Sequence, residues 1–128
     1  MEYSYIPKNN LNLDNQKIVE DLTYDQFNQV VSSTDYIVVV KFYANWCLPC
    51  SNIAPFYDKM PTLPQYKKAR FFRVNANVND DTVIHCNVCE LPTIQFYYRG
   101  MKLGQVVGTD MNEVSNQLKG YIREYGLE

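Results

Sequence analysis

The chain has 128 residues, of which 46% are hydrophobic and 20% charged, and its formal net charge is −2. This length and balance fit one globular domain with a hydrophobic core and exclude an intrinsically disordered protein. The slightly acidic charge gives no reason to expect nucleic acid or an anionic membrane as a partner. The most apolar run, residues 36–40, is far shorter than the about 20 residues of a membrane span, and the N-terminus has no apolar signal-peptide core. We therefore expect a soluble, cytoplasmic protein, or an organellar one if the N-terminus has been trimmed.

The predicted elements alternate between strands and helices. Residues 1–16 are polar and aperiodic, so they are expected to form a flexible N-terminal extension, and residues 17–128 the folded domain. A strand over 17–22 precedes a helix over 23–33 that opens with a capping-box pattern. A strand at 36–44 follows, and then a helix that starts near residue 47, is kinked by Pro55 and ends at Pro61 and Pro64. Next come a strand at 69–77, a short helix at 80–89 and a hairpin of strands at 93–99 and 102–107. The last element is a helix that starts with a second capping box at Asp110 and Glu113.

This order predicts an α/β fold. Alternating elements in the first part of the chain indicate parallel strands, and the late hairpin adds antiparallel ones, so the central sheet is mixed. The strand at 36–44 is apolar on both faces, which indicates a central strand covered by helices on both sides.

Cys47 and Cys50 form a Cys-x-x-Cys pair at the predicted start of a helix. Unpaired backbone N–H groups and the positive end of the helix dipole stabilise a thiolate on the first cysteine, which becomes the nucleophile. Cys50 lies one turn later on the same face and can attack a mixed disulfide. Pro49 restricts the dipeptide between them. The pattern indicates thiol–disulfide chemistry that needs no bound cofactor.

A zinc site is the alternative interpretation of such a pair. It would need two more ligands, which Cys86 and Cys89 could supply. The two pairs are 35 residues apart, however, against roughly 15–20 in compact zinc ribbons, and a helix and a strand are predicted between them. The sequence therefore favours the redox interpretation over metal binding. Cys86 and Cys89 are then either ordinary half-buried cysteines, a regulatory disulfide or thiolation site, or metal ligands, with His85 adding slightly to the last.

Several motifs, in this order and spacing, resemble the thioredoxin family over roughly residues 17–125. They are Phe42-Tyr43-Ala44, Trp46-Cys47-Leu48-Pro49-Cys50, Ile53-Ala54-Pro55, Leu91-Pro92-Thr93, Arg99-Gly100 and Gly108. The resemblance implies a thioredoxin fold. It also implies that Trp46 forms part of the substrate surface and that Pro92 has a cis peptide bond facing the sulfurs. The backbone of Leu91 would then pair with an extended client peptide.

The sequence departs from the family pattern at Lys41 and Leu48. Six residues before the first cysteine, the family usually carries a buried acid that relays a proton to and from the second cysteine. A buried ammonium there would lower the thiol pKa values, which predicts a less reducing couple, whereas a lysine that extends to solvent would have no chemical role. Leu48 replaces the usual glycine and adds apolar area beside the cysteines. We treat Lys41, Leu48 and Pro49 as candidates for tuning the redox potential.

The sequence therefore predicts a monomeric protein-disulfide reductase that acts on disulfide-containing client proteins. The resemblance implies that its electrons come from a thioredoxin reductase or from the glutathione system. The alternative is a thioredoxin-like adaptor that binds a partner with little turnover, an interpretation that Lys41, Leu48 and the Asn-rich N-terminus keep open.

Overall fold

A computed structural model describes residues 15–128, and its centre is a mixed five-stranded sheet. The strands are β1 (Glu20–Asp21), β2 (Ile37–Tyr43), β3 (Ala69–Asn75), β4 (Thr93–Tyr98) and β5 (Met101–Val107). Their order across the sheet is β1-β3-β2-β4-β5, with β1, β3 and β2 parallel and β4 and β5 antiparallel. The predicted mixed sheet, with its parallel section and final hairpin, is confirmed.

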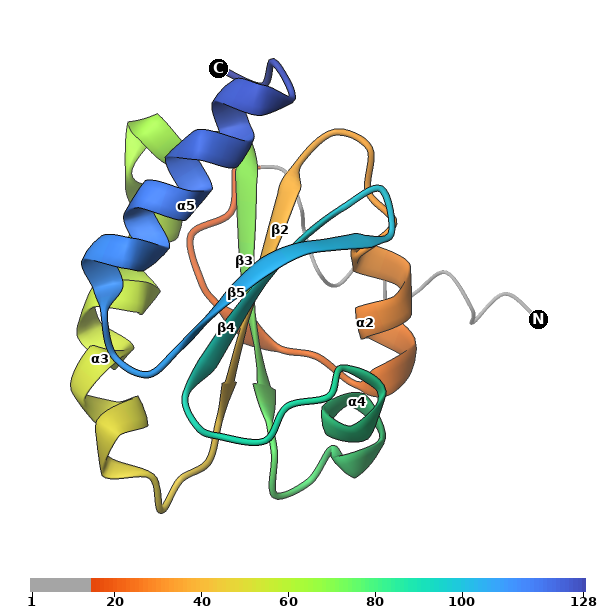
Figure 1. Ribbon diagram of the computed structural model, residues 1–128, viewed down its shortest axis with the longest axis vertical. Coiled ribbons are helices and arrows are strands. Elements are labelled where there is room, and N and C mark those ends of the chain that lie inside the picture. The colour runs from red at the N-terminus through yellow and green to blue at the C-terminus, as the bar shows by residue number, and fades with distance from the viewer. Residues whose placement is uncertain (1–14) are drawn as a thin grey trace.

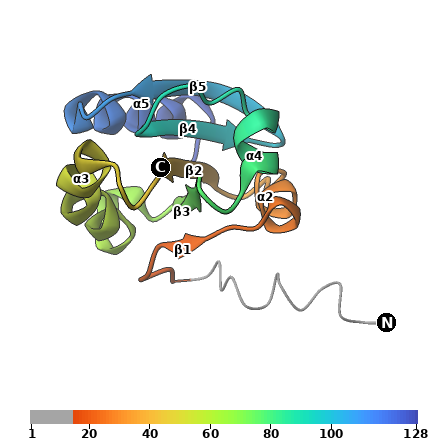
Figure 2. The same cartoon turned by 90° about the horizontal axis from the view of Figure 1, so that it is seen from below.

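Within residues 15–128, four helices cover both faces of the sheet. They are α2 (Tyr24–Val30), α3 (Leu48–Lys59), α4 (Asp80–His85) and α5 (Met111–Glu124), and two short 3₁₀ turns follow α3, at Met60–Thr62 and Pro64–Tyr66. Helices α3 and α5 lie on one face, and α2 and α4 on the other (Figures 1 and 2). None of the helices in residues 15–128 is long and apolar enough to cross a membrane.

Strand β2 contributes to the hydrophobic core on both sides of the sheet, because both of its faces are buried. Ile37 and Val39 belong to the apolar cluster beneath α3 and α5, whereas Val38, Val40 and Phe42 belong to the cluster beneath α2 and α4. Successive side chains of a strand point to opposite faces, so a run that is apolar at nearly every position needs cover on both. The sequence-based prediction of a central, doubly covered strand is confirmed.

The first strand is shorter than predicted. Only Glu20 and Asp21 pair with β3, and the ladder continues for one further bond from the Leu22 N–H to the Arg73 carbonyl at 2.9 Å. Upstream, the side-chain amide of Gln16 bonds both the N–H of Phe71, at 2.8 Å, and its carbonyl, at 2.6 Å. A side chain thus satisfies the backbone groups that a longer strand would have paired.

Gln16 also bears on the predicted domain boundary. It is the last residue of the predicted extension, and it is buried against β3. The interpretation of residues 1–16 as flexible and 17–128 as the domain stays a prediction. Residues 1–14 lie outside the described part of the chain.

Two helices end earlier than the sequence suggests. Helix α2 stops at Val30 because the carbonyls of Val31 and Ser33 accept the N–H groups of Gly100 and Arg99, at 2.8 and 3.0 Å. Those carbonyls therefore bind the β4–β5 turn rather than a further helical turn.

The predicted helix at 80–89 ends at His85. Cys86 caps it and Asn87 takes a left-handed conformation with φ of 56°, which asparagine tolerates better than most residues. Cys86 and Cys89 consequently do not share a helix.

The capping predictions are confirmed at one helix and half-confirmed at the other. Thr23 and Gln26 form both bonds of a capping box at α2. At α5, Asp110 accepts the Glu113 N–H at 3.0 Å, but the Glu113 carboxylate accepts from the Gln117 side-chain amide instead of returning to the cap.

Candidate active site

The two cysteines of the first pair meet at the start of α3. A turn after β2, closed by the bond from the Cys47 N–H to the Ala44 carbonyl at 3.1 Å, brings the chain to the helix. Cys47 is the N-cap residue, and Pro49 lies in the first turn, where its missing N–H removes no helical bond. Cys47 and Cys50 form a disulfide with Cα atoms 5.3 Å apart. The structure therefore represents the oxidised state of the pair.

The sulfur of Cys47 occupies the place of a capping group. It accepts the backbone N–H of Cys50 at 3.2 Å, one of the donors that the first turn of a helix leaves without a helical partner. The same donor and the positive end of the helix dipole favour a negative charge on that sulfur once the disulfide is reduced. Both cysteines are largely buried. This geometry supports the predicted thiolate at the N-terminus of a helix.

The loop before β4 packs against the disulfide. The Leu91–Pro92 peptide bond is cis, as the resemblance to the thioredoxin family implied, and Leu91 packs onto the cluster of Ala44, Cys47 and Cys50. The carbonyl of Pro92 accepts the N–H of Gly108 at 2.9 Å, which fixes the loop to the end of β5. Segments far apart in sequence thus meet at the sulfurs.

Two exposed apolar side chains flank Cys47 in the sequence. Trp46 is 71% exposed and Leu48 is 69% exposed, although both are large apolar side chains. The indole N–H of Trp46 donates to the side-chain oxygen of Asn77 at 3.0 Å. Sequence reasoning missed Asn77, because no spacing signal connects residues 31 positions apart.

Lys41 is buried in β2, with only 2% of its surface exposed. Its ammonium nitrogen lies 5.6 Å from the centre of the Tyr43 ring and 5.1 Å from that of Tyr57, distances at which an aromatic face attracts a cation. Burial lowers the pKa of Lys41, and the carboxylate of Asp58 opposes that shift. Of the two sequence-based interpretations, these observations support the buried ammonium.

Charged neighbours of Lys41 come from other elements. Arg73 faces it across the β2–β3 register and is bonded to Asp21, with 3.1 Å between Arg73 Nε and the carboxylate. The Tyr43 hydroxyl donates to the same carboxylate at 2.7 Å, and burial raises the pKa of Tyr43 to about 12. The sequence could not reveal this group, because its members meet only through the register of three strands.

Cys86 and Cys89 are not part of the disulfide and are both free thiols. Cys86 is buried beside Tyr97, whose hydroxyl donates to its sulfur at 3.4 Å, and burial raises the pKa of its thiol. Cys89 is exposed. In residues 15–128, no three histidine, cysteine or acidic side chains gather as a metal site.

Comparisons with known proteins agree with this geometry. The thioredoxin family model matches residues 18–123. A mitochondrial thioredoxin-2 of Schizosaccharomyces pombe is 35% identical over 99 residues, which span 77% of this chain and 72% of that protein. Thioredoxin of Ophiophagus hannah is 33% identical over 107 residues, which span 83% of this chain and 98% of that protein.

The crystal structure of Malassezia sympodialis thioredoxin superimposes with a TM-score of 0.76 at 30% identity, covering 82% of this chain and 91% of that one. The architecture is therefore the thioredoxin fold. Thioredoxins are disulfide reductases that need no cofactor. With its cysteine pair closed at the start of α3, the chain belongs to the thioredoxin family and is a thiol–disulfide oxidoreductase.

Proposed function

We propose that this chain reduces disulfides in client proteins, with Cys47 as the nucleophile and Cys50 as the resolving thiol. The observation that carries the proposal is the bond from the Cys50 N–H to the Cys47 sulfur at the start of α3. It distinguishes the two cysteines, because only the first takes the capping position that stabilises a thiolate.

In the proposed reaction, the Cys47 thiolate attacks one sulfur of the client disulfide. The client sulfur–sulfur bond breaks, one client thiolate leaves and takes a proton, and a mixed disulfide forms. The Cys50 thiolate then attacks Cys47, which releases the second client thiolate and closes the Cys47–Cys50 disulfide. Two electrons pass to the client, and the closed pair seen here is the product that must be reduced again.

Trp46, Leu91 and Pro92 are the proposed substrate-binding residues. The exposed Trp46 and Leu48 present apolar surface beside the sulfurs. The cis Leu91–Pro92 bond lies on the same cluster, so an extended client segment could pair with the Leu91 backbone while its disulfide meets Cys47. Leu48 widens this surface relative to a glycine and would select apolar clients.

Lys41 is proposed to tune the redox potential, together with Leu48 and Pro49. Lys41 contacts Tyr57, which is two turns beyond Cys50 on the same face of α3. While it is protonated, a buried cation favours the thiolate form of the nearby pair and so stabilises the reduced state. The proposal predicts a less reducing couple than the about −270 mV typical of thioredoxin.

The electron donor is proposed to be a thioredoxin reductase or the glutathione system, and the chain is proposed to act as a monomer. The cytoplasm is the proposed location, and the mitochondrial relative supports an organelle as the alternative. Cys86 and Cys89 take no part in this cycle, and the predicted regulatory role for them stays a prediction.

Insulin reduction with dithiothreitol as the electron donor tests the proposed roles. The wild-type chain should accelerate precipitation of the insulin chains, Cys47→Ser should abolish the acceleration, and Cys50→Ser should accumulate a stable mixed disulfide. Cys89→Ser is the matched control and should keep full activity. A wild-type chain without turnover that still binds a partner would overturn the proposal in favour of the adaptor.

A redox titration against glutathione tests the role of Lys41 separately. Lys41→Asp should give a more negative midpoint than wild type, because it replaces a cation with an acid. A wild-type midpoint at or below about −270 mV would contradict the proposed tuning.

A further inference from the structure

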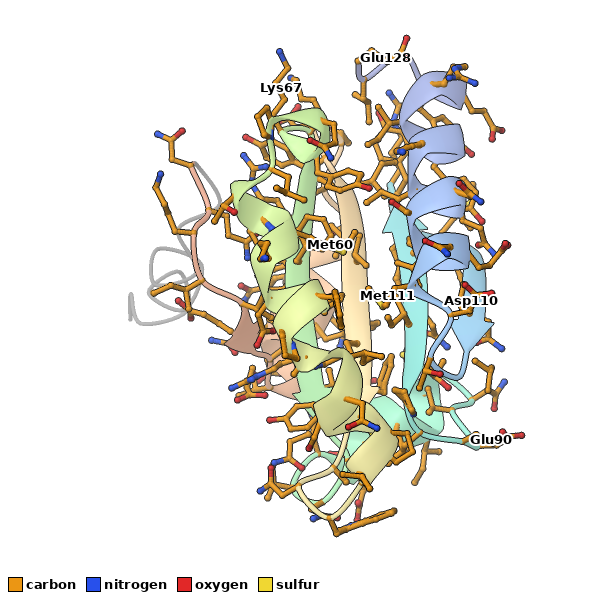
Figure 3. The ribbon with its side chains drawn as sticks, turned by 90° about the vertical axis from the view of Figure 1, so that its left-hand side faces the viewer. Met60, Lys67, Glu90, Asp110, Met111 and Glu128 are labelled. Carbon is orange, nitrogen blue, oxygen red and sulfur yellow. A yellow bond between two sulfur atoms is a disulfide. The ribbon has the colours of Figure 1, made fainter. Side chains whose placement is uncertain are left out.

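Figure 3 shows α3 and α5 on the same face of the molecule, and residues of both helices line a groove there. It consists of three hollows of about 440, 210 and 350 Å³. The first shares Phe56 and Met111 with the second, and the second shares Gln65 and Lys119 with the third. The hollows therefore form one continuous surface, which we call the α3–α5 groove.

One end of the α3–α5 groove opens beside the active site. Its first hollow is lined by Asn52 and Ile53, within one turn of Cys50 on α3, and on the other side by Thr109. Thr109 directly follows Gly108, whose N–H is bonded to the carbonyl of Pro92. A polypeptide held at the sulfurs could thus continue into the groove.

The middle of the groove is apolar. Phe56 is 63% exposed although it lies at the centre of the groove, and Met111 from α5 and Leu63 lie beside it. In Figure 3, Met111 lies between the two helices, close to Met60 at the end of α3. An exposed phenylalanine in a hollow gives an apolar side chain of a partner a surface to bury against.

The end far from the active site is basic. Lys67, Lys119, Arg123 and Glu128 line the third hollow, and Arg123 is paired with Glu128 at 3.8 Å. Neither Lys67 nor Lys119 forms an ion pair within residues 15–128. Because the whole chain carries a net charge of −2, this positive end is a local feature that favours acidic side chains.

We propose that the α3–α5 groove binds a segment of the client protein in which apolar side chains are followed by acidic ones. The segment would lie in the groove while the disulfide of the same client reacts at Cys47, so this inference rests on the proposed function. Because the groove is continuous with the surface beside the sulfurs, we infer that its occupant is part of the client itself. Because Lys67 and Lys119 at the far end form no ion pair within residues 15–128, we infer that the distal part of this segment is acidic. The groove is then a specificity-determining surface.

The spacing in the client follows from the helix. Lys119 is eight residues beyond Met111, about 12 Å along the axis of α5. An extended chain advances about 3.3 Å per residue, so acidic side chains roughly four residues beyond the apolar ones would reach Lys119.

Two synthetic peptides test the proposal. Each carries one cysteine in a mixed disulfide with a fluorescent thiol, then a leucine-rich stretch, then a run of glutamates in one peptide and of lysines in the other. Release of the fluorescent thiol gives kcat/KM for the wild-type chain, for Phe56→Ala and for Lys119→Glu. Lys102→Glu makes the same charge change on β5, outside all three hollows, and is the control.

We expect kcat/KM to be roughly three- to tenfold higher for the glutamate peptide, with the preference reduced at high salt. Lys119→Glu should remove or reverse the preference, Phe56→Ala should slow both peptides, and Lys102→Glu should behave as wild type. Equal rates for both peptides, or a preference that survives Lys119→Glu, would overturn the groove as a client site.

Reduction of a small aromatic disulfide separates this inference from the proposed function, because such a substrate cannot reach the groove. Phe56→Ala, Lys119→Glu and Lys102→Glu should each reduce this small substrate at the wild-type rate. If the wild-type chain fails to reduce it, the proposed function is wrong. In that case, fluorescence anisotropy with labelled peptides that carry serine in place of cysteine tests binding to the groove independently of the redox reaction. Preferential binding of the glutamate peptide that Lys119→Glu abolishes would support the groove, and equal binding would overturn it.

Discussion

Replacing Tyr57 with phenylalanine should loosen the attachment of the active-site helix to the sheet. The side chain projects from α3 and is completely buried. Its hydroxyl lies within hydrogen-bond distance of two backbone carbonyls, that of Val39 in β2 at 3.1 Å and that of Phe72 in β3 at 2.7 Å. One hydroxyl therefore connects the helix that carries both cysteines to two adjacent parallel strands.

The expected cost follows from these contacts. The hydroxyl has one proton and can donate to only one carbonyl at a time, which contributes about 0.5–1.5 kcal/mol net. Phenylalanine also leaves both carbonyls without this donor in a dry environment, so we expect a total loss of about 2 kcal/mol in the free energy of unfolding. For a domain of this size that corresponds to a fall in Tm of roughly 8 °C.

Burial also makes this loss dependent on pH. Desolvation raises the pKa of Tyr57 well above its ordinary value. A raised pKa in the folded state gives a contribution that is complete below pH 10 and is lost as the pH rises through the folded pKa. The difference between wild type and Tyr57→Phe should therefore shrink above pH 10, by about 1.4 kcal/mol for each pH unit.

Urea denaturation of both proteins at pH 7 and pH 10.8 measures these differences. Tyr24→Phe is the matched control, because the Tyr24 hydroxyl forms no hydrogen bond with any residue in 15–128. We expect the control to change stability by less than about 0.5 kcal/mol. A Tyr57→Phe protein as stable as wild type at pH 7, or a difference that grows at pH 10.8, would refute the reasoning.

Three further predictions concern single side chains. Lys41→Met should raise the free energy of unfolding at pH 7 by up to about 1 kcal/mol, because it removes a buried ammonium. Burial lowers the pKa of Lys41, so the unfolded wild-type chain binds more protons than the folded one and wild-type stability rises with pH in this range. The stability gained by Lys41→Met should therefore shrink as the pH approaches 10.5, and a gain that grows with pH would contradict the prediction. Gly104→Ala should destabilise by about 0.5–1.5 kcal/mol, because the added methyl displaces the Tyr121 hydroxyl from its bond to the Leu103 carbonyl. Gly120→Ala, on the open side of α5, should instead stabilise by about 0.5–1 kcal/mol. Equal effects in thermal melts would show that this displacement does not occur. Iodoacetamide should label Cys89 in the folded protein and spare Cys86 until unfolding, because Cys86 is buried and burial raises the pKa of its thiol, which keeps it protonated. Equal labelling of the two by mass spectrometry would contradict this.

The order of the elements could be predicted from the sequence because each strong signal was local. The apolar run around β2, the capping box at Thr23 and the turn at Arg99 and Gly100 each act within a few residues, and all three are found where they were expected. Helix α3 also ends before Pro61, as predicted, and it continues through Pro55.

The boundaries that were wrong depend on contacts between distant segments. Helix α2 stops early because the carbonyls of Val31 and Ser33, just after it, accept N–H groups from the turn between β4 and β5. Strand β1 is short because the side chain of Gln16 bonds the backbone of Phe71. Neither partner is close in sequence, so no periodicity could indicate the outcome.

The active site likewise combines features set by local sequence with features set by contacts between distant segments. The pairing of Cys47 with Cys50 follows from a short motif, the cis bond at Pro92 was implied by the family resemblance, and the structure brings the two segments together. The surroundings of Lys41 follow from no short motif, because Arg73 reaches it only through the pairing of β2 with β3. The groove beside α3 was likewise invisible in the sequence, since it exists only where two helices pack.

The reactivity of Cys47 in the reduced protein is the most direct test of the account. Alkylation with iodoacetamide across a pH series, followed residue by residue by mass spectrometry, gives the pKa of the Cys47 thiol, with the exposed Cys89 as an internal reference. The account predicts that Cys47 reacts faster than Cys89 at neutral pH, with an inflection clearly below the about 8.5 of a free cysteine. A Cys47 that reacts no faster than Cys89 and titrates near that free value would contradict it.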